Sequence, residues 1–249
     1  MRRAVLPPSL QGRDPRRNGY IRRVPTHHRG CAVPTVYSAL ATCYARSVDS
    51  EYWGRYYAVT ADRPSWDTVK LAIALFAADK EAASRPRFAV DLGCGAGRDA
   101  RELLRAGWRV LAVDRERGAI QVLEAATPPE LRPALETRVA DLATFDVPAC
   151  DLVNASLSLP FLAQDLFWPA WERVLASLRV GGRVAAKLFG DHDDSSADPA
   201  MTCPPPQRIR ESLSSFEIEH WLDSEEDTQT ALGEPHHFHL VEVVARRAK

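Results

Sequence analysis

The 249-residue sequence has no apolar run near the roughly 20 residues that a membrane-spanning helix needs. Its five cysteines are odd in number and form no C-x-x-C pair, which argues against a disulfide framework. It also lacks a strong charge of either sign, since the formal net charge is -1 and charged residues make up 26% of the chain, as in a globular protein. We therefore expect a cytoplasmic protein with reduced thiols and no membrane partner.

The first 35 residues differ in composition from the rest of the chain. They hold eight arginines and five prolines but a single acid, Asp14. Charge repulsion and proline together predict a disordered Arg/Pro-rich extension over residues 1–35. A transit peptide, a nucleic-acid arm and an extension without function remain alternatives. The positive excess there leaves the other residues acidic, so we do not expect nucleic acid as the substrate.

A glycine-rich joint follows an apolar run at 88–92. The run is typical of a buried parallel strand, and helical spacing begins again at Asp99. Gly93, Gly95 and Gly97 lie between the two patterns. Because glycine has no Cβ and tolerates positive φ, the backbone can turn sharply there and approach a bound group closely. The joint predicts a nucleotide cradle, with an ordinary turn as the alternative.

The spacing of the glycines distinguishes two classes of cofactor. Dinucleotide sites use G-x-G-x-x-G, whereas this chain has Arg98 at the sixth position. Asp91, at the end of the predicted strand, would repel a pyrophosphate but could pair with an ammonium group. The pattern D-x-G-x-G-x-G therefore predicts a nucleoside that carries a cationic tail.

Polar residues also end the next predicted strands. Asp114 follows the apolar run 110–113, where an acid can accept hydrogen bonds from both ribose hydroxyls, or can cap the next helix. Asp141 and Leu142 follow a third strand and would suit an adenine amine and ring, although a surface turn explains them equally well. Asn154 lies in a fourth strand. Because ligands of α/β sheets bind beyond the carboxyl ends of the strands, we expect these residues at one mouth.

Aromatic residues concentrate before the cradle. We interpret residues 36–86 as a helical lid segment in which Tyr56 and Tyr57 either stack on a ligand or pack on the core. Phe161 and the loop 191–206 would form the opposite wall of an acceptor site. Aromatic walls enclose flat or polarizable molecules and exclude water.

Histidines and acids near the end of the chain invite a metal hypothesis. In the run 192–194, adjacent residues do not converge easily on one ion, so we expect a solvated loop. On a strand, His237 and His239 share a face while His236 points away, which leaves two ligands. An acidic loop is expected at 224–227, between two antiparallel strands. The sequence therefore predicts no metal.

Several stretches together resemble one family. They are similar to the class I S-adenosylmethionine-dependent methyltransferases, in particular the small bacterial branch related to tellurite-resistance and thiopurine methyltransferases. The stretches are the glycine joint and residues 152–161, 181–183, 188–191 and 231–236. The resemblance covers about residues 50–247. It implies an α/β fold with a Rossmann-like, seven-stranded, mainly parallel sheet, an antiparallel last strand and helices on both faces, in a methyltransferase domain at 87–249.

The resemblance implies S-adenosyl-L-methionine as cofactor. Gly93, Gly95 and Gly97 would meet the methionine tail, Asp114 the ribose and Asp141 the adenine amine. The full set of expected cofactor-binding residues is Asp91, Gly93, Cys94, Gly95, Gly97, Asp114, Arg115, Asp141, Leu142 and Asn154. A nicotinamide-dependent oxidoreductase and a non-catalytic S-adenosylmethionine-binding protein are the alternative functions.

For the acceptor the resemblance implies a small molecule, methylated in line. The expected substrate residues are Tyr56, Tyr57, Phe161 and Asp191. A polarizable sulfur, selenium or tellurium nucleophile needs no general base, whereas oxygen or nitrogen would, with Asp191 and His192 as candidates. The arginine-rich extension has no counterpart in the family, and Ser195 stands where the family commonly has a tryptophan.

Overall fold

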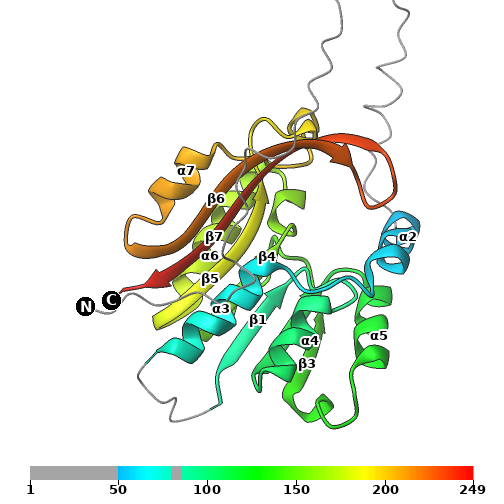
Figure 1. Cartoon of the computed structure of the whole chain (residues 1–249), viewed down its shortest axis with the longest axis vertical. Coiled ribbons are helices and arrows are strands. Elements are labelled where there is room, and N and C mark those ends of the chain that lie inside the picture. Colours follow the sequence, from blue (N-terminus) through cyan, green and yellow to red (C-terminus); the bar gives the residue numbers. More distant parts are fainter. Residues whose placement is uncertain (1–49, 80–85, 249) are drawn as a thin grey trace, which may run out of the picture. The chain divides into compact units, whose positions relative to one another are not determined.

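The structure is a computed structural model that describes residues 50–79 and 86–248. Its strands are β1 Phe88–Leu92, β2 Arg109–Asp114, β3 Leu135–Val139, β4 Cys150–Ser156, β5 Leu178–Phe189, β6 Phe216–Gln229 and β7 Pro235–Arg247. They form one sheet in the order β3-β2-β1-β4-β5-β7-β6 (Figure 1). Strands β1 to β5 are parallel, and β7 is antiparallel to both neighbours. The predicted fold class is confirmed.

Helices cover both faces of the sheet. They are α2 Ser50–Thr60, α3 Asp67–Ala78, α4 Arg98–Arg105, α5 Arg117–Ala126, α6 Gln164–Ser177 and α7 Pro206–Ser212, with short 3-10 turns at Arg132–Ala134, Leu159–Phe161 and Asp194–Ala197. Apolar residues of α3, α4 and α5 pack with one face of the strands, and those of α6 and α7 with the other. Side chains that alternate along β1, such as Ala89 and Val90, enter the two clusters in turn.

No helix in the described ranges combines the length and apolarity that crossing a membrane requires. The expected extension at 1–35 lies outside the described residues, as do Cys31 and Cys43. Of the expected lid segment 36–86, the structure describes α2 and α3. Helix α3 buries Val69, Ala72 and Phe76 in the core. This half of the segment therefore packs on one face of the sheet.

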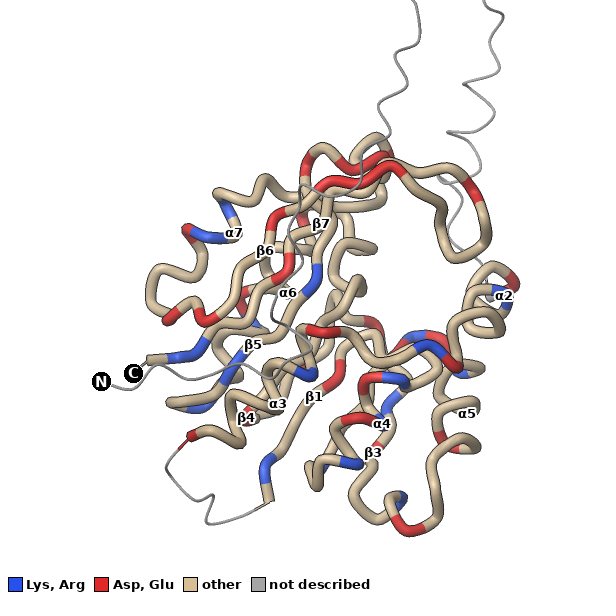
Figure 2. Tube along the Cα trace, in the orientation of Figure 1, with Lys and Arg blue, Asp and Glu red and all other residues tan. Residues whose placement is uncertain are grey.

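Strands β6 and β7 form a long hairpin that continues past the sheet. Its ladder runs from the pair Phe216–Arg247 to the pair Gln229–Pro235. The expectation of a loop at 224–227 is wrong, because these residues pair with β7 throughout. Their acidic side chains hide the strand pattern in the sequence, while the backbone bonds that make the strand depend on β7. Figure 2 shows acids along this hairpin.

A buried arginine ties the hairpin to the helical layer. Arg183 on β5 is 1% exposed, and its guanidinium Nη1 lies 2.8 Å from Asp79 Oδ2 at the end of α3. Its Nε donates to Glu219 Oε2 on β6 at 2.6 Å. The guanidinium also lies 4.3 Å from the centre of the Phe76 ring. One side chain therefore joins α3, β5 and β6.

We expect Arg183→Ala to lower the free energy of unfolding by about 3 kcal/mol, because it leaves two half-buried carboxylates without their partner. Urea denaturation at neutral pH measures this. The control is Arg138→Ala, whose pair with Glu136 is exposed and should contribute less than about 1 kcal/mol. Equal stability of the two variants would contradict the role given to Arg183.

Candidate active site

A cavity of about 380 Å³ opens at the carboxyl ends of β1, β2 and β4. Helix α2 and the tip of the β6–β7 hairpin lie on two sides of it (Figure 1). Most of the expected cofactor residues line it: Asp91, Gly93, Cys94, Gly95, Asp114, Arg115, Asp141 and Leu142. Gly97 and Asn154 lie behind its wall. The parallel arrangement brings together strand ends that are far apart in the sequence.

The three glycines adopt positive φ, with values of 67° at Gly93, 52° at Gly95 and 80° at Gly97. A Cβ on Gly95 would lie 2.9 Å from Tyr57 Cε1, and one on Gly93 would overlap the side chain of Ser158. A Cβ on Gly97 would overlap Leu123 of α5. The first two glycines therefore give room beside the cavity, while the third allows α4 and α5 to pack closely.

Asp91 is buried at the end of β1 and belongs to a chain of polar groups. Its Oδ1 accepts a hydrogen bond from Asn154 Nδ2 at 2.7 Å, and the same Nδ2 donates to Asp99 Oδ2 at 3.1 Å. Asp99 Oδ1 accepts from the Trp66 amide at 2.9 Å. Asp91 Oδ2 is buried without a hydrogen-bond partner in the described part of the chain. Burial, and then the charge of Asp99, raise the pKa of Asp91 to about 8.

Asp91 and Asp99 are buried close together and share the Asn154 side-chain amide as a donor, an arrangement that a nearby positive charge would stabilise. Two carboxylates lie close to one another, and only one of the four oxygens has no hydrogen-bond donor. Because its pKa is raised to about 8, Asp91 is largely protonated at neutral pH, and a cationic donor beside it would stabilise its ionised form and complete its hydrogen bonding. A phosphate there would be repelled.

Asp114 fastens the glycine turn to the end of β2. Its Oδ2 accepts from the Gly95 amide at 2.8 Å and its Oδ1 from the Glu116 amide at 2.9 Å. Burial raises the pKa of Asp114, and these two amides act in the opposite direction. A carboxylate has about four lone-pair positions, so two remain for a ligand at the cavity wall.

Asp141 lies in a surface turn at the edge of the cavity. It is exposed, and its Oδ1 accepts from the Ala143 amide at 2.9 Å, as in a surface turn. It also lines the cavity, next to the half-buried Leu142. The surface turn therefore forms part of the cavity wall.

Aromatic rings form the opposite part of the cavity. The Trp53 and Tyr57 rings are stacked with their centres 5.7 Å apart. Trp53 also packs edge to face against Phe161, with 5.1 Å between the ring centres. The centre of the Phe161 ring lies 6.3 Å from that of Phe189, and the centre of the Phe189 ring lies 6.4 Å from that of Phe238. Tyr56, Tyr57 and Phe161, which the sequence analysis expects at the acceptor, all line the cavity. Phe189 and Phe238 were missed, because only the β5–β7 pairing brings them there.

Asp191 and His192 lie elsewhere. They line a separate depression on the outside of the β6–β7 hairpin, so the geometry does not support Asp191 as a wall of the cavity or either residue as a base within it. The reason is the chain direction after β5. Phe189 faces the cavity, and the Gly190 amide then donates to the His239 carbonyl at 2.7 Å, which carries the next residues away.

Backbone strain marks the end of β4. Leu157 has a φ of 53°, a left-handed conformation that is rare for a bulky residue, and it lines the cavity. The adjacent Ser158 hydroxyl is buried without a partner in the described residues. Burial also raises the pKa of Tyr57 and of Cys94, so both stay protonated at neutral pH.

Residues 89–182 match a family model described as a methyltransferase domain. A search of curated protein sequences finds no match.

Solved structures share the fold. TehB from Haemophilus influenzae superposes with a TM-score of 0.62 and 17% identity over 80% of this chain and 66% of its own. A Burkholderia thailandensis 1,6-didemethyltoxoflavin-N1-methyltransferase, solved with S-adenosylhomocysteine, superposes with a TM-score of 0.52 and 20% sequence identity. The match covers 89% of this chain and 94% of that protein. An S-adenosylmethionine-dependent methyltransferase from Mesorhizobium loti superposes with a TM-score of 0.51 and 20% sequence identity, over 72% of this chain and 98% of that protein. The chain therefore spans about two thirds of TehB and nearly all of the other two.

We expect Asp91→Asn to stabilise the cofactor-free protein. Asparagine keeps an acceptor for Asn154 but removes the buried acid. Because the folded-state pKa of about 8 exceeds the usual value of about 3.9, the carboxyl destabilises the fold increasingly as pH rises from about 4 to 8. The gain should therefore be larger at pH 7.5 than at pH 5, by at most about 1.4 kcal/mol per pH unit.

Urea unfolding at both pH values measures this difference. Asp141→Asn is the control, since its exposed carboxyl should change stability by less than about 0.5 kcal/mol. An Asp91→Asn protein that is less stable than wild type at pH 7.5 would contradict the buried-acid interpretation.

Proposed function

We propose that this chain, in which residues 89–182 match a methyltransferase domain, transfers the methyl group of S-adenosylmethionine to a small-molecule acceptor. The observation that carries the proposal is the Asp91 carboxylate, which is buried at the cavity wall with an oxygen that lacks a donor among the described residues. The α-ammonium of a methionine tail supplies both the charge and the donors that this oxygen needs.

The same geometry argues against a nicotinamide dinucleotide. A pyrophosphate binds where the amides of a helix N-terminus are accompanied by neutral or basic groups. Here α4 carries Asp99 in its first turn, next to Asp91. The Arg98 guanidinium, which could offset these acids, lies 4.1 Å from the centre of the Trp66 ring. Two acids at this position favour a cationic ligand.

The rest of the cofactor finds matching groups along the strand ends. Asp114 retains acceptor capacity for the ribose hydroxyls while it holds the Gly95 amide. Asp141 and Leu142 offer an acceptor and an apolar contact for the adenine. Asn154 acts from behind the wall, where it orients Asp91. These assignments follow the residue types and their order along the wall.

The bound cofactor supplies a methyl carbon that is already activated, so the chain must mainly align the acceptor and exclude water. The rings of Trp53, Tyr57, Phe161, Phe189 and Phe238 serve both purposes. They fit a flat or polarizable acceptor of small size.

The choice of acceptor atom follows from the titratable groups. Tyr57 and Cys94 stay protonated, and Asp191 and His192 lie outside the cavity. On the acceptor side the described lining contains one carboxylate, Glu226 of the hairpin. We propose a nucleophile that needs no general base, such as sulfur, selenium or tellurium, and Glu226 is the candidate base for an oxygen or nitrogen acceptor. We further propose that the enzyme works in the cytoplasm, where unpaired thiols such as Cys150 persist.

Calorimetric titration should show that the protein binds S-adenosylhomocysteine and not NAD. Asp114→Ala should weaken the binding of S-adenosylhomocysteine roughly 5- to 150-fold, since lost hydrogen bonds to buried hydroxyls cost about 1 to 3 kcal/mol. Arg138→Ala, on the exposed surface of β3, is the control and should bind normally. Equal affinity of wild type and a folded Asp114→Ala protein would refute the ribose assignment, and tight NAD binding would refute the cofactor.

The acceptor site can be tested separately from the cofactor site. With labelled S-adenosylmethionine and a panel of small thiols, chalcogen oxyanions and total RNA, we expect label in a small acceptor. Phe238→Leu should then lower kcat/KM for that acceptor by roughly 2- to 10-fold while the affinity for S-adenosylhomocysteine stays constant. Leu222→Ala, exposed on the neighbouring β6, is the control. Label in RNA alone would overturn the acceptor class.

A further inference from the structure

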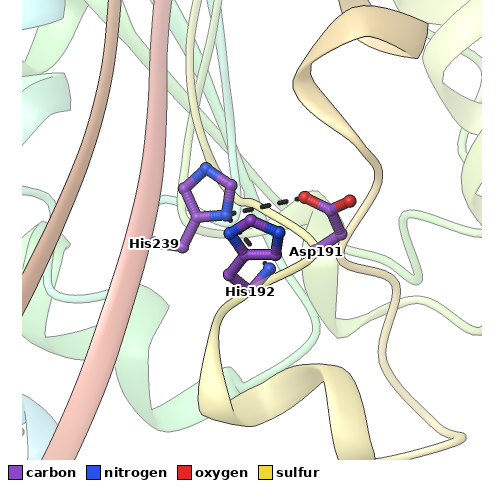
Figure 3. Close-up of side chains that lie close together, drawn as sticks. All are labelled: Asp191, His192 and His239. Atoms are coloured by element: carbon purple, nitrogen blue, oxygen red, sulfur yellow. Dashed lines mark hydrogen bonds and ion pairs between the residues drawn. The ribbon is translucent and has the colours of Figure 1, made fainter.

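Asp191, His192 and His239 lie close together outside the cavity (Figure 3). The Nδ1 atom of His239 accepts the His192 backbone amide at 3.0 Å, and its Nε2 lies 2.9 Å from Asp223 Oδ1. Both ring nitrogens of His239 are therefore occupied, and these contacts hold the β6–β7 hairpin to the turn after β5. The opposite is true of Arg98, which lies on the wall of the cavity.

Arg98 is the first residue of α4 and follows the glycine turn directly. Its guanidinium lies over the Trp66 ring, 4.1 Å from the ring centre. Among the described residues, no carboxylate pairs with this guanidinium and no oxygen accepts a hydrogen bond from it. A guanidinium has five N–H donors in a planar fork. Arg98 therefore presents to the cavity a charge and a set of donors that the described part of the chain leaves unused.

Trp66 fixes the position of this guanidinium. The Trp66 backbone amide donates to Asp99 Oδ1 at 2.9 Å, which ties the turn before α3 to the first turn of α4. A second cation, Lys187 Nζ, lies 4.0 Å from the centre of the same ring, but it is also 2.7 Å from Glu242 Oε1. Of the two cations at Trp66, Lys187 thus has an acid partner in the described structure and Arg98 has none. A ring that packs on the flat side of a guanidinium leaves the N–H edge free to bind a ligand.

The unpaired guanidinium lies close to the acid that we assign to the cofactor ammonium. Asp99 follows Arg98 in α4, and its Oδ2 shares the Asn154 amide with Asp91. An α-amino acid carries an ammonium and a carboxylate on the same carbon. A site that binds this group therefore needs an acid and a base near one another. Asp91 provides the acid, and Arg98 provides the base.

We propose that Arg98 binds the α-carboxylate of the methionine part of the cofactor, with Trp66 holding the guanidinium in place for this contact. The inference rests on the proposed function, because it needs the methionine tail at the glycine turn. A guanidinium binds a carboxylate through two parallel hydrogen bonds, which the point charge of a lysine cannot reproduce. Arg98 is therefore a specificity-determining residue, which selects a nucleoside that ends in an amino acid over one that ends in an amine alone.

The test compares two nucleosides by calorimetry on the full chain. They are S-adenosylhomocysteine and its analogue with hydrogen in place of the carboxylate. Both keep the ammonium group, so the contact with Asp91 is common to them. We expect wild type to bind S-adenosylhomocysteine roughly 10- to 100-fold more tightly, since the analogue loses hydrogen bonds between charged groups.

Substitution of Arg98 should remove this preference. In Arg98→Met the affinities for the two nucleosides should agree within about 3-fold, because the partner of the carboxylate is gone. Arg98→Lys keeps the charge without the fork and should show an intermediate preference. Thermal unfolding checks that both variants are folded. Because the preference is a ratio measured on one protein, a partial loss of active material in a variant does not change it.

Two other arginines that line the cavity are the matched controls. Arg63 is exposed after the end of α2, and Arg115 Nε lies 3.6 Å from Glu116 Oε1. Arg63→Met and Arg115→Met should keep the wild-type preference. Equal affinities of wild type for the two nucleosides, or a preference that survives in a folded Arg98→Met protein, would overturn the inference and leave the proposed function standing. A wild type that binds neither nucleoside would refute the proposed function and this inference with it.

Discussion

The burial of the Asp91 carboxyl group is the constraint on which the structure of the cavity depends. Asp91 pairs in register with Asn154 of β4, and the Asn154 amide reaches across to Asp99 of α4. Two strands and a helix are thus joined by one donor shared between two acids. Such a centre is unfavourable in an apolar interior unless a cation completes it. The surrounding core, with Leu103 and Val153 fully buried on opposite faces, stabilises the fold enough to keep it.

Under the proposed function, stability and cofactor binding act against each other at Asp91. Proteins commonly place such unfavourable groups where a ligand will bind, because binding then supplies the missing interaction. Leu157, with its left-handed backbone, and the buried Ser158 hydroxyl lie at the end of β4, on the same cavity. Strain and incomplete hydrogen bonding therefore occur together at this end of the strands.

The β6–β7 hairpin presents different residues on its two sides. In β7, Phe238 and Leu240 face the cavity, and His239 between them faces the outside. One strand therefore contributes to the wall of the cavity and, on its other side, to the contacts of His239 with Asp223 and the His192 amide. The Arg183 network anchors the other end of the hairpin to α3. The wall is held at its base by this ion pair and further out by the contacts of His239.

The sequence determined the glycine turn, the acids at the ends of β1 and β2, and the order of helices and strands. These features depend on neighbouring residues: periodicity, turn chemistry and spacing are local properties of the chain. Only the tertiary structure decided which side of β5 receives Asp191, that residues 224–227 form a strand, and that Phe189 meets Phe238. Each of these depends on the register between β5, β6 and β7. That register is set by pairing between residues 51 to 63 positions apart for β5 with β7 and 6 to 31 positions apart for β6 with β7, and it leaves no periodic signal in the sequence.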